Sequence, residues 1–313
     1  MIEYYNSNST KADNGMYNPN DIYYPEVQEL REKEIKFKDM IKRYVNADKS
    51  ADVIFTSGSA ESIATIMHWA KRCIQYGTCI ATSNSHPLVK LNAENYELEY
   101  REDDEFNYHQ YDREPAVIFL THASPYDGSI FDIDKYIDKY EEYDIDTFDE
   151  SKRINYRPII AIDCCQSIKY IQPDMKRWHA DVLFFSLHKI GGEFGTGVMV
   201  LNHHVQFIPL IAGNGLRGGT PNTYNVIKAM DQFSRLPLPM HSQHEYKELV
   251  DKFKSKGYEV YTTNGKHLNT TIKIKPKNND CVFNEIRNLA LQGIYVSGPT
   301  ACSTEDLYIR VSI

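Results

Sequence analysis

The strongest constraint on the fold of this chain is an alternation of short apolar runs with amphipathic segments. Runs such as "ADVIFTSGS" (51–59) and "PIIAI" (158–162) are typical of short buried strands. Segments between such runs, for example 60–75, have the spacing of apolar residues expected of helices. Alternating strands and helices imply a mostly parallel sheet covered by helices on both faces, so we expect an α/β fold.

The same pattern divides the chain into an N-terminal arm (1–20), a large domain (21–236) and a small C-terminal α+β domain (237–313). In the large domain we expect helices at 26–46, 60–75, after Pro87 and at 132–142, and strands within 51–59 and at 78–82, 96–100, 115–121, 158–162, 181–187 and 196–201. In the small domain we expect helices at 241–256 and 281–291, and strands at 257–261, 268–274, 293–297 and 306–312.

Composition excludes several classes of protein. The net charge of −8 over 313 residues argues against a nucleic-acid-binding surface, because phosphate contacts need clustered Lys and Arg. No run of 18 apolar residues occurs, so we expect no membrane span. The first residues, "MIEYYNSNST", do not have the pattern of a signal peptide, and we expect a cytoplasmic protein. The spacing of the six cysteines fits no zinc site, so we expect no metal.

Polar residues gather where the predicted strands of the large domain end. Ligands of open parallel sheets bind beyond the carboxyl ends of the strands, so these positions are the first candidates for a site. The candidates are Ser57, Gly58, Ser59, His86, Asp163, Ser186, His188 and Lys189.

Together these residue types suit pyridoxal phosphate (PLP). A lysine that loses its proton can condense with the aldehyde of PLP, and Lys189 is placed to do so. A carboxylate on the pyridine nitrogen keeps the ring protonated, which is the role expected of Asp163. The phosphate needs small residues, hydroxyls and a helix N-terminus, and the turn 58–60 offers these. Ser186 and His188 add donors. Gln166 and His86 are candidates for the ring hydroxyl and the ring face.

Eight segments, in order from residue 54 to the C-terminus, resemble the fold-type-I PLP enzymes of the class V aminotransferase group, most closely the NifS-like cysteine desulfurases. The segments are "IFTSGSAES", "SNSHPLV", "THASPYDGSIFDI", "AIDCCQS", "FFSLHKIGGEFGTGVMVL", "GLRGGTPN", "VSGPTACS" and "IRVSI". The resemblance implies the fold-type-I architecture of PLP-dependent transferases, with a mostly parallel central sheet and a small C-terminal α+β domain.

The resemblance also implies a role for each matching residue. Lys189 forms the imine, Asp163 holds the ring nitrogen, Gln166 contacts the ring hydroxyl and His86 stacks on the ring. The phosphate is bound by Ser186, His188 and the turn of Gly58, Ser59 and Ala60.

Three further roles follow from the same resemblance. Thr220 matches a threonine that reaches the phosphate of the neighbouring subunit, which implies a homodimer with shared sites. Arg310 matches the arginine that clamps the substrate carboxylate, and its guanidinium fork suits that task. Cys302 matches the nucleophile that takes sulfur from L-cysteine, leaving alanine and an enzyme persulfide that can pass sulfur to an acceptor protein. Asn6 lies in a segment that weakly resembles the substrate side of the family's site.

The chain departs from the family pattern at several points, and these keep other functions open. The phosphate-binding threonine of the family is replaced by Ala60, paired asparagines by Ser124-Pro125, and only seven residues separate Cys302 from Arg310. One alternative is another PLP reaction on the same fold, by a transaminase or a selenocysteine or cysteine-sulfinate lyase. The other is a non-catalytic scaffold.

Each candidate residue also has an ordinary structural interpretation. In that interpretation Lys189 is a solvated turn lysine, Asp163 a helix N-cap, His86 a surface loop residue, Arg310 a strand-edge ion-pair partner and Cys302 a small packing residue.

Overall fold

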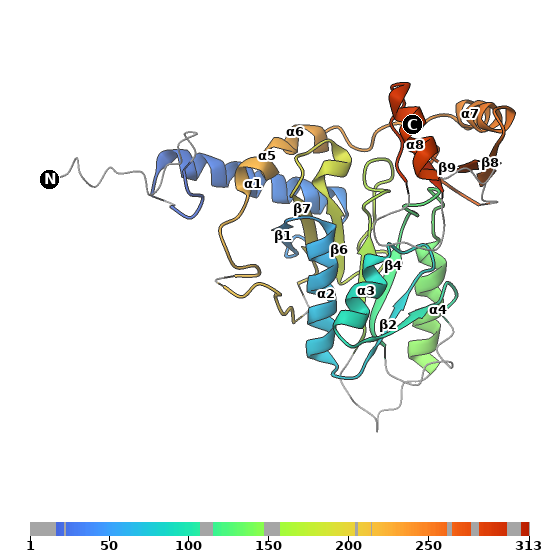
Figure 1. Ribbon diagram of the computed structural model, residues 1–313. Helices are drawn as coiled ribbons and strands as arrows, with labels where there is room; N and C mark the ends of the chain where they lie inside the picture. The colour runs from blue at the N-terminus through green and yellow to red at the C-terminus, as the bar shows by residue number, and fades with distance from the viewer. Residues whose placement is uncertain are drawn as a thin grey trace.

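The computed structural model describes residues 17–21, 23–106, 115–146, 157–203, 206–213, 215–261, 265–276, 282–298 and 308–312. These residues form a seven-stranded sheet flanked by helices and a separate three-stranded sheet with two helices (Figure 1). None of the described helices is long and apolar enough to cross a membrane.

The large sheet is mostly parallel, as the alternation of strands and helices predicts. Its spatial order is β1-β7-β6-β5-β4-β2-β3. Strands β3, β2, β4, β5 and β6 pair in parallel, and β7 runs antiparallel to both β6 and β1. The strands are β1 (Asp52–Thr56), β2 (Thr78–Ala81), β3 (Glu99–Glu102), β4 (Pro115–Thr121), β5 (Ile159–Asp163), β6 (Val182–Ser186) and β7 (Gly197–Leu201).

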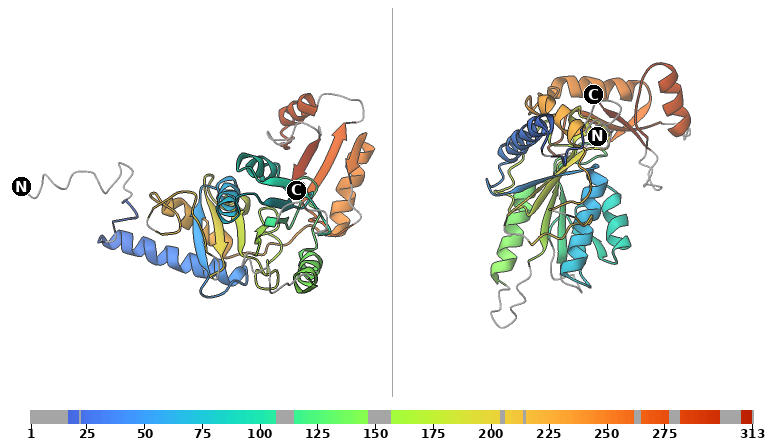
Figure 2. Two further views of the ribbon diagram at one scale, coloured as in Figure 1. Left: turned by 90° about the horizontal axis from the view of Figure 1, so that it is seen from below. Right: turned by 90° about the vertical axis from the view of Figure 1, so that its left-hand side faces the viewer.

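Helices cover both faces of this sheet. Figure 2 shows α2 and α3 on one face and α4 on the other. The helices of the large sheet are α1 (Pro25–Tyr44), α2 (Ser59–Cys73), α3 (Leu88–Asn95), α4 (Ile133–Asp146), α5 (Thr223–Lys228) and α6 (Met230–Phe233). Crossover helices shield both faces from water, which explains why β4, β5, β6 and β7 are buried at every residue.

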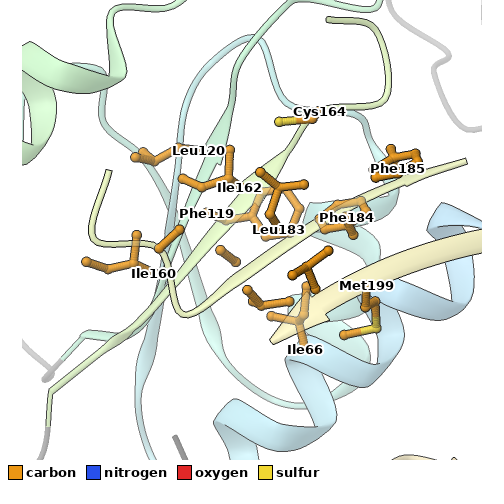
Figure 3. Close-up of a cluster of buried hydrophobic side chains, with 14 of the residues drawn as sticks. Ile66, Phe119, Leu120, Ile160, Ile162, Cys164, Leu183, Phe184, Phe185 and Met199 are labelled. Carbon is orange, nitrogen blue, oxygen red and sulfur yellow. The ribbon is translucent and has the colours of Figure 1, made fainter. Parts of the chain in front are cut away.

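The core of the large domain lies between the sheet and these helices. Figure 3 shows Phe119, Ile162, Leu183 and Phe184 of adjacent strands packed together, with Ile66 of α2 beside Met199 of β7. Phe119 and Phe184 are fully buried, with ring centroids 5.7 Å apart. Burying a side chain of this size contributes about 1.5–3 kcal/mol, so the packing fixes the strand ends that carry the polar candidates.

The three-stranded sheet has a hydrophobic cluster of its own. Its antiparallel order is β10-β9-β8, and its elements are α7 (Gln243–Ser255), β8 (Tyr258–Tyr261), β9 (Thr271–Pro276), α8 (Val282–Leu291) and β10 (Ile309–Ser312). Ile272, Ile274 and Ile309 are fully buried in this cluster. Helix α7 begins with a capping box, in which Ser242 and Glu245 each bond the other's backbone N–H.

Backbone hydrogen bonds join the loop after β4 to the segment before β9. The N–H of Ile130 donates to the carbonyl of Lys266 at 2.8 Å, and the N–H of Leu268 donates to the carbonyl of Gly128 at 2.7 Å. Gly128 has a φ of +77°, a conformation that L side chains adopt at a cost. These bonds hold the small sheet against the ends of the large one.

Most predicted elements are confirmed within a few residues, but the strand predicted at 293–297 is wrong. The N–H of Ile294 bonds back to the carbonyl of Leu289 and Gly293 has a φ of +78°, so this segment closes α8. Within it, Ser297 alone forms a bridge, to Arg310. Helices α5 and α6 were not predicted. The segment around Lys189 begins as a 3-10 helix, η4 (Leu187–Ile190).

Candidate active site

A cavity of about 230 Å³ opens where the parallel strands end. Its walls come from the start of α2, the segments after β2, β4 and β5, the turn η4 and strand β10. The residues that line it are Ser59, Ile63, His86, Thr121, Ala123, Pro125, Asp163, Cys165, Gln166, His188, Lys189 and Arg310. The small sheet therefore contributes to the same cavity as the large one, through Arg310.

Asp163 lies at the end of β5, directly beside Thr121 at the end of β4 in the parallel register. Its side chain is almost fully buried, and its Oδ1 accepts a 2.8 Å hydrogen bond from the backbone N–H of Cys165. Burial raises the pKa of Asp163, while the Cys165 hydrogen bond and the charge of Lys189 oppose that rise. A cationic partner in the cavity would favour the ionised carboxylate.

Lys189 is held on a short, well-anchored turn. The N–H of Leu187 donates to the carbonyl of Thr196 at 3.1 Å, and the N–H of Gly192 donates to the carbonyl of Leu187 at 2.9 Å. Burial and the nearby guanidinium of Arg310 lower the pKa of Lys189, and Cys165 and Asp163 counteract this less strongly. These effects shift Lys189 toward the neutral amine, which is the nucleophilic form.

The turn before α2 lies against the end of β6. The backbone N–H of Ser59 donates to Oγ of the buried Ser186 at 3.0 Å, and Gly58 has a φ of +144° that favours glycine. Gly197 of β7 packs so closely that an added Cβ would lie 2.7 Å from the Cα of Gly58. Two glycines therefore let the backbone form a narrow cradle at the helix N-terminus.

Arg310 reaches the cavity from β10. Its Nη1 donates to the carbonyl of Pro125 at 2.9 Å, while its Nε is buried without a hydrogen-bond partner among the described residues. A buried N–H without a partner is costly, so this guanidinium is suited to an incoming acceptor such as a carboxylate. Pro125 lacks the amide side chain of the family's asparagine, but its carbonyl orients Arg310.

Two histidines complete the polar lining, and both are shifted toward the neutral form. Burial, together with Lys189 and Arg310, lowers the pKa of His86. Burial and Lys189 lower the pKa of His188. The Nδ1 atom of His86 accepts from the backbone N–H of Leu88 at 3.2 Å, which places the proton on Nε2.

The cavity has the charge balance of an anion site. Lys189 and Arg310 line it with the two histidines, and Asp163 is the sole carboxylate among its described lining residues. Opposite charge on a ligand would relieve the repulsion that, after burial, depresses the pKa of Lys189. A lysine amine, a buried carboxylate, a glycine cradle and an unpartnered guanidinium are together the donor set that PLP and an amino acid require.

The structure brings most of the predicted site residues together. Lys189, Asp163, Gln166, His86, His188, Ser59 and Arg310 line the cavity. Ser186 and Gly58 stand behind Ser59, whereas Ala60 and Thr220 are exposed and do not line the cavity. The predictions for Cys302 and Asn6 lie outside the described residues.

Some lining residues were missed from the sequence. Cys165 lies two residues after Asp163 and lines the cavity, but no site role is predicted for it from the sequence. Thr121 ends β4 beside Asp163, and this position at a strand end was a usable signal. Ile63 and Ala123 carried no chemical signal.

Comparison with known proteins agrees with this geometry. The family model described as "Aminotransferase class-V" matches residues 1–305. The chain belongs to the class V aminotransferase family. Members of this family and the cysteine desulfurases depend on PLP, and the residues of the cavity fit that cofactor.

The named relatives of this chain are distant from it in sequence. The chain is 25% identical over 297 residues to the cysteine desulfurase IscS of Pseudomonas putida, covering 85% of this chain and 68% of that protein. It is 25% identical over 194 residues to the cysteine desulfurase IscS 1 of Archaeoglobus fulgidus, covering 56% of this chain and 47% of that protein.

Among solved structures, a NifS-like protein superposes with a TM-score of 0.78 at 20% identity, covering 95% of this chain and 85% of that one. A cysteine desulfurase of Thermococcus onnurineus, in its apo form, superposes with a TM-score of 0.75 at 18% identity, covering 100% of this chain and 84% of that one. These similarities confirm the predicted fold: a mostly parallel sheet of the NifS-like, fold-type-I kind.

Proposed function

We propose that this protein is a PLP-dependent enzyme that removes sulfur from L-cysteine, giving alanine and a persulfide on Cys302. The observation that carries the proposal is the convergence of Lys189, Asp163 and Arg310 on one cavity. These residues come from η4, β5 and β10, and each has the environment that its role in the family requires. The similarity to named cysteine desulfurases supports this choice of reaction.

The residues that would hold the cofactor are those already described. Lys189 would bind its aldehyde, Asp163 its ring nitrogen, and the turn of Gly58 and Ser59 with Ser186 its phosphate. When bound, PLP supplies an electron sink that stabilises negative charge at the substrate Cα.

Lys189 would move the proton at the substrate Cα. Burial and Arg310 lower the pKa of Lys189, which shifts it toward the neutral amine that can accept this proton. His86 keeps its own proton on Nε2 and carries no charge in this environment, so it can lie against an aromatic ring without competing for the substrate carboxylate.

Arg310 would bind the substrate carboxylate. The Pro125 carbonyl fixes one edge of its guanidinium, and the buried Nε–H needs an acceptor. A carboxylate held there by charge-assisted hydrogen bonds fixes the amino acid relative to Lys189.

Sulfur transfer would fall to Cys302, whose thiolate attacks the substrate sulfur. The S–S bond of the persulfide forms as the Cβ–S bond of the substrate breaks, and Cβ then takes a proton to give alanine. Cys165 is a poor nucleophile although it lines the cavity, because burial and Asp163 raise its pKa and keep it a thiol.

The homodimer is part of the same proposal. Thr220 is exposed and does not line the cavity of its own chain, which supports a role in the site of a second copy. Light scattering on the PLP-loaded protein would test this, with a monomer mass as the contradicting result.

The reaction is tested by incubating the PLP-loaded protein with L-cysteine and a thiol reductant, and measuring alanine and sulfide. We expect both products in equal amounts, and loss of both in Cys302→Ala. The control is Cys73→Ala, which removes an exposed thiol on α2 and is expected to leave both products unchanged. Sulfide release that survives in Cys302→Ala would favour another PLP reaction on this fold.

A further inference from the structure

An ion pair outside the cavity links two segments next to the predicted phosphate cradle. Nε of Arg217 lies 2.5 Å from Oε1 of Glu61, and Nη2 donates to Oε2 at 3.1 Å. Both side chains are largely buried, with exposed fractions of 24% for Arg217 and 11% for Glu61. A bidentate pair of this kind has a fixed geometry, unlike a flexible surface pair.

Glu61 also holds the turn that leads into α2. Its Oε2 accepts a 2.8 Å hydrogen bond from the backbone N–H of Ser57, and Ser59, two residues on, lines the cavity. Arg217 in turn donates from Nη1 to the carbonyl of Gly218 at 3.2 Å. The pair therefore connects the turn 57–59 with the segment around residues 217–218.

The negative charge of Glu61 would oppose phosphate binding at this turn if Arg217 did not neutralise it. Glu61 lies in the first turn of α2, where the helix dipole favours negative charge. A dianionic phosphate beside Ser59 would compete for the same positive helix end and would be repelled by an unpaired Glu61 carboxylate. The guanidinium of Arg217 cancels that carboxylate charge.

We propose that Arg217 is a positioning residue for the cofactor: by pairing with Glu61 it neutralises the carboxylate next to the turn 57–59 and so permits a dianionic phosphate to bind there. The inference rests on the proposed function, since it concerns the phosphate of PLP. It assigns a role to a residue that does not touch the cavity and acts through Glu61.

The test is an absorbance titration of the full-length protein with PLP, and in parallel with pyridoxal, which lacks the phosphate. We expect Arg217→Met to weaken PLP binding about tenfold, which corresponds to about 1.4 kcal/mol. We expect the double variant Glu61→Gln with Arg217→Met to bind PLP within about threefold of wild type. The amide oxygen introduced by Glu61→Gln can still accept the Ser57 N–H, but it carries no charge. Pyridoxal binding should be unchanged throughout.

Arg235→Met is the matched control. Arg235 pairs with Asp231 at 2.5 Å, but both side chains are about two-thirds exposed, so its loss should leave PLP binding unchanged. Circular dichroism of each variant without PLP shows whether the fold is retained.

Each outcome decides between the two proposals. Failure of wild type to bind PLP overturns the proposed function and this inference with it. If wild type binds PLP, three results overturn the inference alone: Arg217→Met binding like wild type, the double variant binding as weakly as Arg217→Met, or an equal loss for pyridoxal. The last two would show that Arg217 acts on the fold and not through the charge of Glu61.

Discussion

The close approach of Gly197 to Gly58 allows a sharp prediction about the cofactor cradle. In Gly197→Ala the new Cβ would lie 2.7 Å from both the Cα of Gly58 and Oγ1 of Thr56. Ordinary contacts of a Cβ begin near 3.4 Å, so the neighbours must move by several tenths of an ångström. Gly58 presents backbone at this contact, so no flexible side chain can absorb the strain. Either β1 separates from β7 or the turn 57–59 shifts away from Ser186.

The cost follows from the nature of the contact. Overpacking a well-packed site costs about 1–3 kcal/mol of stability. Each kcal/mol lost lowers the melting temperature of a large domain by about 2–4 °C. We therefore expect Gly197→Ala to remain folded, to melt several degrees lower and to lose PLP affinity more than this loss of stability explains. Differential scanning fluorimetry and absorbance titration with PLP measure the two effects.

A matched control separates the cradle from a general effect of alanine. Gly265 has open space around a built Cβ and no positive φ, so Gly265→Ala should change neither the melting temperature nor PLP binding. The reasoning is refuted if Gly197→Ala binds PLP as tightly as wild type, because the turn 57–59 would then not form the phosphate cradle.

Two further predictions follow from the charges in the cavity. In Arg310→Gln, loss of a positive charge should raise the pKa of Lys189, so the pH profile of PLP capture should move to higher pH; an unchanged profile in stopped-flow absorbance would contradict this. In Asp163→Asn, the amide still accepts the Cys165 N–H, while the buried carboxylate, whose folded-state pKa is raised, is gone. Wild type loses stability as the pH rises through that pKa, because the buried carboxyl then ionises, and the variant should not. Without cofactor, the variant should therefore melt at a higher temperature than wild type at pH 7 and at the same temperature at low pH. It should also bind PLP more weakly. A lower melting temperature at pH 7 would count against the raised pKa.

The mostly parallel character of the large sheet was predictable because local signals and global fold agree. Strands such as β5 and β6 are continuous apolar runs, which is the pattern of strands covered on both faces. Asp163 and Lys189 follow those runs directly, so the rule that ligands bind at strand ends located them. Both residues line the same cavity in the structure.

Long-range contacts were not predictable from the sequence. The bond from Arg310 to the carbonyl of Pro125 joins residues 185 positions apart and depends on how the small sheet sits against the large one. The ion pair between Glu61 and Arg217 spans 156 positions and shows no local signal. At 293–297 apolar residues suggested a strand, but Gly293 follows α8 in a left-handed turn, and this local helix-ending turn overrode the strand propensity.

The central claim is that Lys189 is the residue that binds the cofactor, and reductive trapping tests it most directly. The protein is incubated with PLP, treated with borohydride, digested and analysed by mass spectrometry, with Lys189→Ala alongside. We predict a pyridoxyl-phosphate label on Lys189, whose pKa burial and Arg310 lower, and no labelled peptide in the variant. A wild-type protein without label at Lys189, or a label confined to other lysines, would contradict the account.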